Sequence, residues 1–524
     1  MSLSVLLAVA FVGAALYYIC PLRFRWVLLL LLSYGFYLTC GVSALPFILI
    51  TTLTTWAGAL KIGRIGESGK AYLHEHKAEL TAEEKKTRKA KTRSAQRIWF
   101  FAVLLLNFGV LAVLKYLNPV MAWGASLTGK NAPALGLVLP LGISFYTFQS
   151  MGYLIDVYNA KYAPEKNPAK FALFVSFFPQ LIQGPIARFD QLESQLVEPH
   201  RFDLDNIERG LLMLWGLFKK KVIADRALPL VEAVFGNQSA YGGAVIVVGV
   251  LFYSLQQYAD FSGGIDITRG VARLFGIDLA ENFRRPLFST SLTDFWRRWH
   301  ITLGAWMRDY LFYPLSLSKP FGKLGKFTRK HLKGKLGKIL PTSLATFLVY
   351  FVIGIWHGAN WRYVAFGFWN GGIITLSLLL APYFLRWKQA LRINDKSKGW
   401  HLFQLVRTNL LVFFGRYITR APRFLTAVWM VKETFLHPNL PDLWNGTLMT
   451  LGLGGGDFLI LFLGVATLLL AEWYQEKKGP IRPMLERQSP FLQWVAILVP
   501  LVVLFCFGVL RADYISSDFI YKQF

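Results

Sequence analysis

The sequence predicts an all-α, polytopic integral membrane protein in which about eleven to thirteen transmembrane helices surround a central tunnel or chamber. The 524-residue chain is 54% hydrophobic and 17% charged, whereas soluble proteins carry about 25% charged residues. Apolar stretches of roughly 18 or more residues, long enough to cross the hydrocarbon core of a bilayer, recur along the chain. Because the charged residues gather between these stretches, we exclude a soluble globular protein.

Three predicted spans, residues 3–20, 26–40 and 45–60, precede a strongly basic segment, residues 61–98. Basic segments that connect transmembrane helices tend to face the cytoplasm. We therefore expect residues 61–98 to form a cytoplasmic loop, which places the N-terminus outside after three crossings. Residues 1–134 are interpreted as an N-terminal transmembrane scaffold that carries this loop.

The middle of the chain has apolar segments that polar or helix-breaking residues interrupt. They are residues 135–155, 171–186 and 253–266. Irregular polar backbone at membrane depth is stable only where protein buries it or where it lines a cavity. We therefore expect residues 140–361 to form the walls of an internal chamber, and residues 135–382 to be the catalytic core.

The net charge of +27 comes largely from clusters of basic residues between the predicted spans. Besides the first basic loop, they are residues 219–221, 319–338, 386–398 and 477–487. We expect these clusters on the cytoplasmic face, beside anionic lipid headgroups. Stacking aromatic residues do not alternate with them as they do in proteins that bind single-stranded nucleic acid, so nucleic acid is excluded as a partner.

The C-terminal part of the chain, residues 383–524, is interpreted as further transmembrane helices followed by an exterior tail. If residues 477–487 are cytoplasmic, a last span over residues 491–510 delivers residues 511–524 to the outside, so that both termini are exterior. The three cysteines lie in apolar segments without the spacing of metal ligands, and the sequence indicates no metal site.

Two histidines are the main catalytic candidates. His357 follows the apolar run of residues 344–355, and an ionisable side chain at the end of a membrane span needs a partner or a function. His300 follows two tryptophans and two arginines, with Trp296 and Gly304 one helical turn away on either side, so a helix is expected there. An interfacial belt of aromatic and arginine side chains accounts for its neighbours but not for His300 itself. Neutral imidazole is suited to accept a proton near neutral pH.

The segments around these histidines, together with four other motifs, resemble the membrane-bound O-acyltransferase family. More narrowly, the chain is similar to the bacterial branch that acts in alginate biosynthesis, in peptidoglycan O-acetylation and in D-alanyl transfer to teichoic acid. The motifs that carry the resemblance are residues 139–149, 177–180 with 184–185, 258–263, 282–286, 294–303 and 356–361.

The resemblance implies acyl transfer from a cytoplasmic thioester, through a tunnel in the protein, to an acceptor outside. It implies that His357 corresponds to the family's nearly invariant histidine and that His300 corresponds to a second, less constant polar position. It also implies acetyl-CoA as the donor and a bacterial inner-membrane location. Further residues expected to line the tunnel or bind the donor are Asn360, Trp296, Asp260, Gln149 and Tyr146.

The tail adds one more point of resemblance. Residues 519–524 are similar to a C-terminal aromatic motif of this branch in which a central tyrosine, here Tyr521, accepts the acyl group. Lys522 stands where that motif usually has an aromatic residue. An exported, esterase-like O-acetyltransferase is the expected partner, which would pass the acetyl group to a cell-wall polysaccharide or exopolysaccharide.

Three alternatives remain open from the sequence. The protein could transfer D-alanine from a carrier-protein thioester to teichoic acid. It could be a proton-coupled transporter in which the histidines and Asp260 form a proton pathway. It could also be a structural scaffold of an export complex, in which substitutions of the histidines would be silent.

Overall fold

A computed structural model describes residues 3–129, 135–332 and 334–509 of the chain. The described residues form helices joined by turns and extended links, with one isolated β-bridge between Phe283 and Trp299 and no β-strand. The predicted all-α fold is confirmed. The chain divides into two compact units, the first made of Met1–Gly210 and Thr268–Ala280 and the second of Leu211–Ile267 and Glu281–Phe524.

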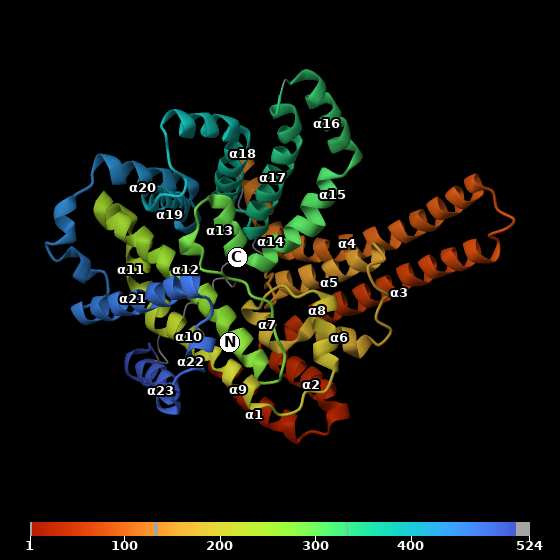
Figure 1. The fold of residues 1–524 in the computed structure, drawn as a ribbon, viewed down its shortest axis with the longest axis horizontal. Coiled ribbons are helices and arrows are strands. Elements are labelled where there is room, and N and C mark those ends of the chain that lie inside the picture. Colours follow the sequence, from red (N-terminus) through yellow and green to blue (C-terminus); the bar gives the residue numbers. More distant parts are fainter. Residues whose placement is uncertain (1–2, 130–134, 333, 510–524) are drawn as a thin grey trace. The chain divides into compact units, whose positions relative to one another are not determined.

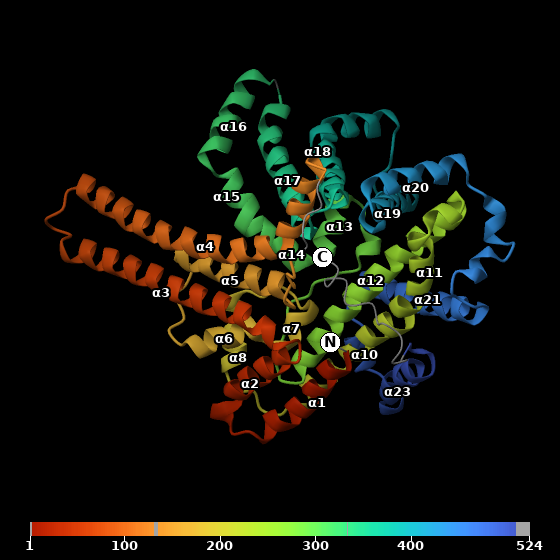
Figure 2. The ribbon, with the colours of Figure 1, turned by 180° about the vertical axis from the view of Figure 1, so that it is seen from behind.

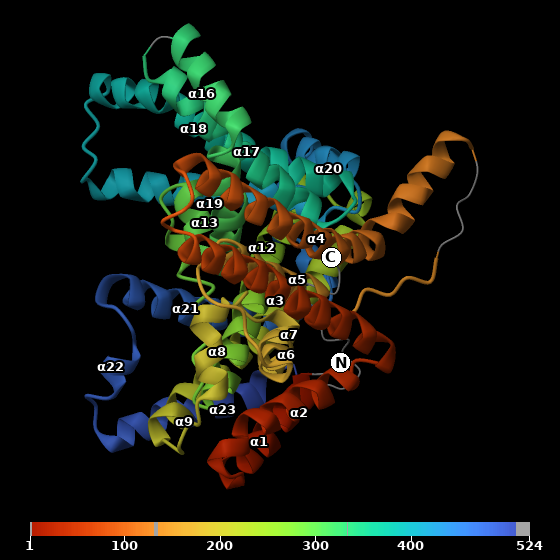
Figure 3. The same ribbon diagram turned by 90° about the vertical axis from the view of Figure 1, so that its right-hand side faces the viewer.

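The first unit is built around the two long helices α3 (Leu45–Glu75) and α4 (Ala82–Leu127), which lie side by side (Figure 1). Figure 3 shows the two N-terminal helices of the same unit packed against each other. The helices of this unit are α1 (Leu3–Ile19), α2 (Arg25–Leu38), α3 (Leu45–Glu75), α4 (Ala82–Leu127), α5 (Ile143–Tyr158), α6 (Pro168–Ser176), α7 (Phe178–Gln183), α8 (Phe189–Val197) and α9 (Leu204–Gly210).

The basic segment 61–98, expected as a loop, is helical apart from residues 76–81. Its two halves are extensions of α3 and α4. Residues 82–98 are rich in alanine, glutamate, lysine and arginine, which are strong helix formers. Thr81 begins α4 with a capping box: its hydroxyl accepts a hydrogen bond from the Glu84 N–H, and the Glu84 carboxylate accepts one from the Thr81 N–H. Local propensity therefore continues both membrane helices into the basic segment.

The interruptions expected in the middle of the first unit are present. Residues 135–140 have no regular secondary structure, and α5 begins after Gly142, whose φ of 72° is in the left-handed region. A Cβ at Gly142 would lie 2.5 Å from the Leu181 carbonyl oxygen, so only glycine fits this close approach. The apolar stretch 171–186 is divided at Phe177 into α6 and α7.

The second unit contains the remaining helices. Figure 2 shows α15, α16 and α17 of this unit lying together. The helices are α10 (Leu212–Leu217), α11 (Asp225–Gly236), α12 (Gly243–Arg273, of which residues 268–273 belong to the first unit), α13 (Leu292–Arg298), α14 (Ile301–Met307), α15 (Tyr313–Ser316), α16 (Lys319–His331), α17 (Leu336–His357), α18 (Trp361–Ala390), α19 (Lys398–Arg420), α20 (Phe424–Leu436), α21 (Gly455–Lys478), α22 (Arg482–Leu485) and α23 (Pro490–Phe507), with π-helical turns at Phe218–Ala224 and Arg308–Phe312.

Among the described residues, seven helices are long and apolar enough to cross a membrane. These are α3, α4, α12, α17, α18, α21 and α23. The prediction of a polytopic membrane protein is therefore confirmed. The expected number of spans was larger, because several segments counted as spans form shorter helices, such as the 14-residue α2 and the 16-residue α5.

Residues 253–266 were expected to be irregular, and this expectation is wrong, because they lie within the continuous helix α12. The glycine at position 263 serves helix packing. A Cβ at Gly263 would lie 2.7 Å from the Gly216 carbonyl oxygen, and a Cβ at Gly216 would lie 2.5 Å from the Gly263 carbonyl oxygen. Two facing glycines thus bring the backbones of α10 and α12 into contact, as small residues do between membrane helices.

The basic run at residues 219–221 was expected in a cytoplasmic loop, and the structure corrects this. The run lies in the π-helical turn after α10, and two of its three lysines are buried. Lys219 pairs with Asp266 at 2.7 Å, and Lys220 pairs with Asp260 at 2.5 Å. Burial of a charge is costly without a partner of opposite charge. These lysines therefore belong to the ion pairs of the second unit's interior.

The contact between α10 and α12 gives a stability prediction. We expect Gly263→Ala to lower the free energy of unfolding by about 1–3 kcal/mol, because the methyl group must displace backbone. Gly372→Ala in α18 is the matched control, since no atom lies within 4 Å of a Cβ there. Thermal unfolding of the purified proteins in detergent measures both. Equal midpoints for the two variants would contradict the packing role.

Candidate active site

The second unit encloses a cavity of about 420 Å³, a volume typical of small-molecule sites. Its walls come from α12, α13, α14, α17, α18 and α19. His300 and His357, which are 57 residues apart in the chain, both line it, and so does Trp296. The structure therefore brings together three of the residues that the sequence singled out.

His300 does not lie within a helix, which corrects the expectation from its spacing. α13 ends at Arg298 and α14 begins at Ile301. Between them His300 has φ 50° and ψ 52°, in the left-handed region. Such a conformation in a residue other than glycine is strained and persists only where the surroundings hold it.

A short antiparallel backbone pairing holds this break in the helix. The Arg284 N–H donates to the Arg298 carbonyl at 2.9 Å, and the Ile301 N–H donates to the Asn282 carbonyl at 3.0 Å. The bridge between Phe283 and Trp299 lies between these two hydrogen bonds. Residues 282–284, which lie 16 to 18 residues before His300, thereby fix the backbone on either side of it.

The side chain of Asn282 determines which nitrogen of His300 carries the proton. Its Oδ1 accepts hydrogen bonds from the Thr302 N–H and the Thr302 hydroxyl, both at 2.9 Å. His300 Nδ1 lies 3.2 Å from the same oxygen. An oxygen that already accepts from a backbone N–H is an acceptor, so Nδ1 must be the donor. The neutral ring then has its lone pair on Nε2.

The environment of His300 keeps the ring uncharged. His300 lies outside the candidate spans, and its ring contacts that of Phe261 edge-on, with centroids 4.9 Å apart. Burial lowers the pKa of His300 to about 3, because a desolvated imidazolium is unfavourable. At neutral pH the side chain therefore presents a hydrogen-bond acceptor and not a cation.

His357 is the last residue of α17 and lies among aromatic rings. Its ring centroid is 4.8 Å from that of Trp356, 5.7 Å from that of Phe366 and 6.1 Å from that of Tyr363. Gly358 follows directly after His357 and has no side chain to fill the space beside it. The Tyr363 ring occupies that space, since a Cβ at Gly358 would lie 2.8 Å from it. The glycine thus lets Tyr363 pack beside the histidine.

The other predicted residues of the second unit have different positions. The Trp296 indole N–H donates to Asn370 Oδ1 at 3.2 Å, which holds the ring in the cavity wall. Asn360 caps α18 by accepting a hydrogen bond from the Arg362 N–H at 3.1 Å. Asp260 is buried against Lys220. Neither Asn360 nor Asp260 is among the described residues that line the cavity.

The remaining predicted residues lie elsewhere in the chain. Tyr146 and Gln149 are buried residues of α5 in the first unit. The Gln149 amide donates to the Phe174 carbonyl at 2.5 Å. Tyr521 lies outside the described residues.

Sequence reasoning missed an arginine in the cavity wall. Arg416 of α19 is only 6% exposed, and it lines the cavity with Thr419 from the same helix. The sequence feature that could have pointed to Arg416 is its position between apolar and aromatic residues of α19. An ionisable side chain in such a segment usually has a function. Among the described lining residues, three are arginines and none is aspartate or glutamate.

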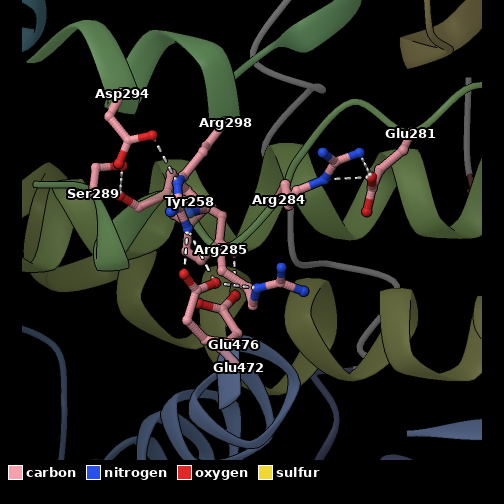
Figure 4. Close-up of polar contacts among 10 residues, drawn as sticks. Tyr258, Glu281, Arg284, Arg285, Ser289, Asp294, Arg298, Glu472 and Glu476 are labelled. Atoms are coloured by element: carbon pink, nitrogen blue, oxygen red, sulfur yellow. Dashed lines mark hydrogen bonds and ion pairs between the residues drawn. The ribbon is translucent and has the colours of Figure 1, made fainter. Parts of the chain in front are cut away.

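A cluster of ion pairs fastens the segment before His300 to α21 (Figure 4). Glu476 accepts hydrogen bonds from Arg285 at 2.6 Å and from Arg298 at 3.0 Å. Asp294 pairs with Arg298 at 3.1 Å. Because one carboxylate binds both Arg285, next to the first paired segment, and Arg298, in the second, the cluster stabilises the backbone that leads into His300.

Comparison with known proteins identifies the family. The sequence profile of the membrane-bound O-acyltransferase family, MBOAT, matches residues 165–332. The chain is 32% identical to a protein described as "Probable alginate O-acetylase AlgI" from Azotobacter vinelandii, over 88% of this chain and 83% of that protein. The chain belongs to the membrane-bound O-acyltransferase family. This membrane-bound O-acyltransferase is an enzyme and a multi-pass membrane protein.

Two further relatives show the range of acyl groups in the family. The membrane-bound O-acyltransferase is 32% identical to a peptidoglycan O-acetyltransferase from Helicobacter pylori, over 56% of this chain and 57% of that protein. It is 27% identical to a teichoic acid D-alanyltransferase from Streptococcus thermophilus, over 56% of this chain and 70% of that protein. The alginate-type relative therefore matches more of the chain than either of these.

The role of Asn282 gives the second prediction. We expect Asn282→Ala to lower the rate of acyl transfer by at least about tenfold, because the proton on His300 Nδ1 loses its acceptor. Asn282→Asp is the matched variant. It keeps the acceptor oxygen and replaces an amide nitrogen that has no hydrogen-bond partner in the described part of the chain. Initial rates with a labelled donor distinguish them, and equal losses would contradict the orienting role.

Proposed function

We propose that this membrane-bound O-acyltransferase moves an acetyl group from cytoplasmic acetyl-CoA to an exterior acceptor, for O-acetylation of an extracytoplasmic polysaccharide. The observation that carries the proposal is that His300 and His357 line one cavity in the second unit. An exported, esterase-like O-acetyltransferase would take the group onward. The names of the alginate-type and peptidoglycan relatives support transfer to a polysaccharide.

In the proposed mechanism His357 is the general base. The acceptor hydroxyl gives its proton to His357 as its oxygen attacks the thioester carbonyl carbon, which forms a tetrahedral intermediate. The intermediate collapses, the carbon–sulfur bond breaks, and the proton passes from His357 to the departing thiolate. General base catalysis of this kind contributes typically 10²- to 10⁴-fold. The thioester is already electrophilic, so no protein nucleophile is needed for this step.

His300 has a different part in this mechanism. With the proton on Nδ1 and the lone pair on Nε2, the neutral ring accepts a hydrogen bond and does not donate one into the cavity. It therefore orients a hydroxyl or amide N–H of a substrate. Asn360 is not proposed as an oxyanion donor, because it is not among the described residues that line the cavity.

The electrostatics of the cavity favour acetyl over D-alanyl transfer. A D-alanyl thioester carries an ammonium group next to its reacting carbonyl, and a buried ammonium needs a carboxylate partner. The described lining residues include Arg297, Arg308 and Arg416 and no carboxylate. The neutral acetyl group is compatible with this surface. D-alanyl transfer from a carrier protein remains the alternative, and the family leaves the transporter hypothesis without support.

The proposed first acceptor is Tyr521 in the tail. A phenol has a pKa near 10 and needs a base to react at neutral pH. If the basic helix α16 is cytoplasmic, α17 runs outward from it and His357 lies at the exterior end of that helix, where an exterior tail can reach it.

The catalytic base is tested by substitution. We expect His357→Ala to abolish acetyl transfer while the protein remains inserted and folded, since no other group then removes the acceptor proton. His401→Ala, at an exposed histidine of α19, is the control and should retain wild-type activity. The measurement is transfer from radiolabelled acetyl-CoA by the purified proteins. Normal transfer by a well-folded His357→Ala protein would disprove the assignment.

The tail relay has its own test. Intact-mass analysis after incubation with acetyl-CoA should show one added acetyl group on the wild-type chain and on Tyr514→Phe, and none on Tyr521→Phe. Both substitutions remove one tail hydroxyl, so only a specific acceptor separates them. Absence of label and of thioester hydrolysis in all folded variants would shift the donor to a carrier-protein thioester.

A further inference from the structure

The tetrahedral intermediate of the proposed transfer carries a negative charge on the former carbonyl oxygen. When the acceptor oxygen attacks, the π pair of the carbonyl moves onto that oxygen, and the acceptor proton goes to His357. His357 keeps this proton for the departing thiolate, and His300 presents a lone pair on Nε2 instead of an N–H. A donor for the negatively charged oxygen therefore has to come from another residue of the cavity wall.

Arg416 is a buried cation in this wall. It lines the cavity from α19, and its side chain is almost completely removed from solvent. α19 is not among the candidate spans, and burial lowers the pKa of Arg416 to about 10, because a desolvated charge is unfavourable. The guanidinium is therefore still a cation at neutral pH.

The charge of Arg416 has no counter-ion in the part of the chain that the structure describes. No carboxylate of the described residues acts on it, and its Nε has no hydrogen-bond partner there. The face of the Trp299 ring offers only a weak attraction, with its centroid 5.1 Å from the guanidinium carbon. Buried Lys220, by contrast, pairs with Asp260. The positive charge of Arg416 is therefore available to an anion that forms in the cavity.

Aromatic rings connect Arg416 with His300. Trp299, on which Arg416 packs, directly precedes His300 in the chain. The Phe261 ring contacts both residues, with its centroid 6.2 Å from that of Trp299 and 4.9 Å from that of His300. Arg416, His300 and His357 border one cavity of about 420 Å³. A thioester carbonyl in this space has both the base and a cation beside it.

The other possible donors of the wall are weaker. Arg297 and Arg308 are exposed, so water screens their charge, and Arg308 already has Asp309 at 2.8 Å. Gln257 and Tyr350 also line the cavity, but they are neutral. A hydrogen bond from a charged donor is roughly twice as strong as one between neutral groups.

We propose that Arg416 is a catalytic residue that stabilises the oxyanion of the tetrahedral intermediate. The inference rests on the proposed transfer from acetyl-CoA with His357 as the base, and it adds the group that stabilises the transition state. A guanidinium N–H of Arg416 donates to the oxygen as its charge forms. When the intermediate collapses, the electron pair returns to the carbon–oxygen bond, the carbon–sulfur bond breaks, and His357 gives its proton to the thiolate. A cation that is in place before the reaction needs no reorganisation at that moment.

Steady-state kinetics test this role. We expect Arg416→Gln to lower kcat for cleavage of acetyl-CoA by about 10²- to 10³-fold, as for loss of an oxyanion donor. KM for acetyl-CoA should stay nearly unchanged, because the interaction exists only in the transition state and the intermediate. The measurement is release of the CoA thiol by the purified full-length protein, which does not depend on the identity of the acceptor.

Arg420→Gln is the matched control. Arg420 lies one turn along α19, and its guanidinium carbon also lies over an aromatic ring, 5.7 Å from the centroid of Phe235. It is not among the described residues that line the cavity. Arg420→Gln should therefore retain the wild-type kcat, although it removes the same charge from the same helix.

Chemical rescue separates a catalytic from a structural role. Arg416→Ala leaves space at the wall, and added guanidinium ion should restore part of kcat with saturation. Urea has nearly the same shape without the charge and should not. Arg416→Lys keeps the charge as a point donor without the planar fork, so a smaller loss of roughly tenfold is expected. This conservative variant also serves if Arg416→Gln does not fold.

The outcomes separate this role from the proposed function. A wild-type kcat in folded Arg416→Gln would overturn the role, as would a change in KM alone or equal rescue by guanidinium and urea. In each of these cases, cleavage of acetyl-CoA by the wild-type protein leaves the proposed function intact. Absence of acetyl-CoA cleavage by folded wild-type protein would overturn the proposed function and the role of Arg416 together.

Discussion

The site depends on the backbone pairing between residues 282–284 and 298–301. This pairing interrupts a helix that the local sequence favours, and it holds His300 in a left-handed conformation at the interruption. The same segment supplies the Asn282 side chain that fixes the ring tautomer. Ion pairs from Glu476 to Arg285 and Arg298 join the two paired stretches of backbone before the break. Position, tautomer and support of one histidine thus arise from a single local arrangement.

The second histidine is positioned by close helix packing. Gly354 of α17 brings that helix against α18, because a Cβ there would lie 2.5 Å from the Tyr363 carbonyl oxygen. This packing of α17 against α18 places the end of α17, and with it His357, in the cavity wall. Small residues at such a contact let van der Waals packing join helices where the hydrophobic effect is absent. The proposed catalytic geometry therefore rests on a strained backbone segment at His300 and on the tightly packed helices α17 and α18 at His357.

Charged side chains are arranged differently in the interior of the second unit and at the wall of its cavity. Cations inside the second unit are neutralised by carboxylates, as Lys220 is by Asp260. The described cavity wall instead combines two histidines with arginines and has no carboxylate. Such a surface suits a neutral acyl group and anionic substrate parts. The names of the alginate-type and peptidoglycan relatives agree with an acetyl group.

The membrane class and the family could be predicted from the sequence, because apolar length and short motifs are local properties, and the same motifs singled out the two histidines that line the cavity. The sequence also located the breaks near Gly142 and after Phe177. It did not determine the break at His300, since the partners that impose it are distant in the chain and the local spacing suits a helix. The tertiary structure was needed to show that Asp260 neutralises a buried lysine, that Asn360 is a helix cap and that Arg416 lines the cavity. Each of these depends on which distant side chain lies opposite, and periodicity within one segment carries no information about that.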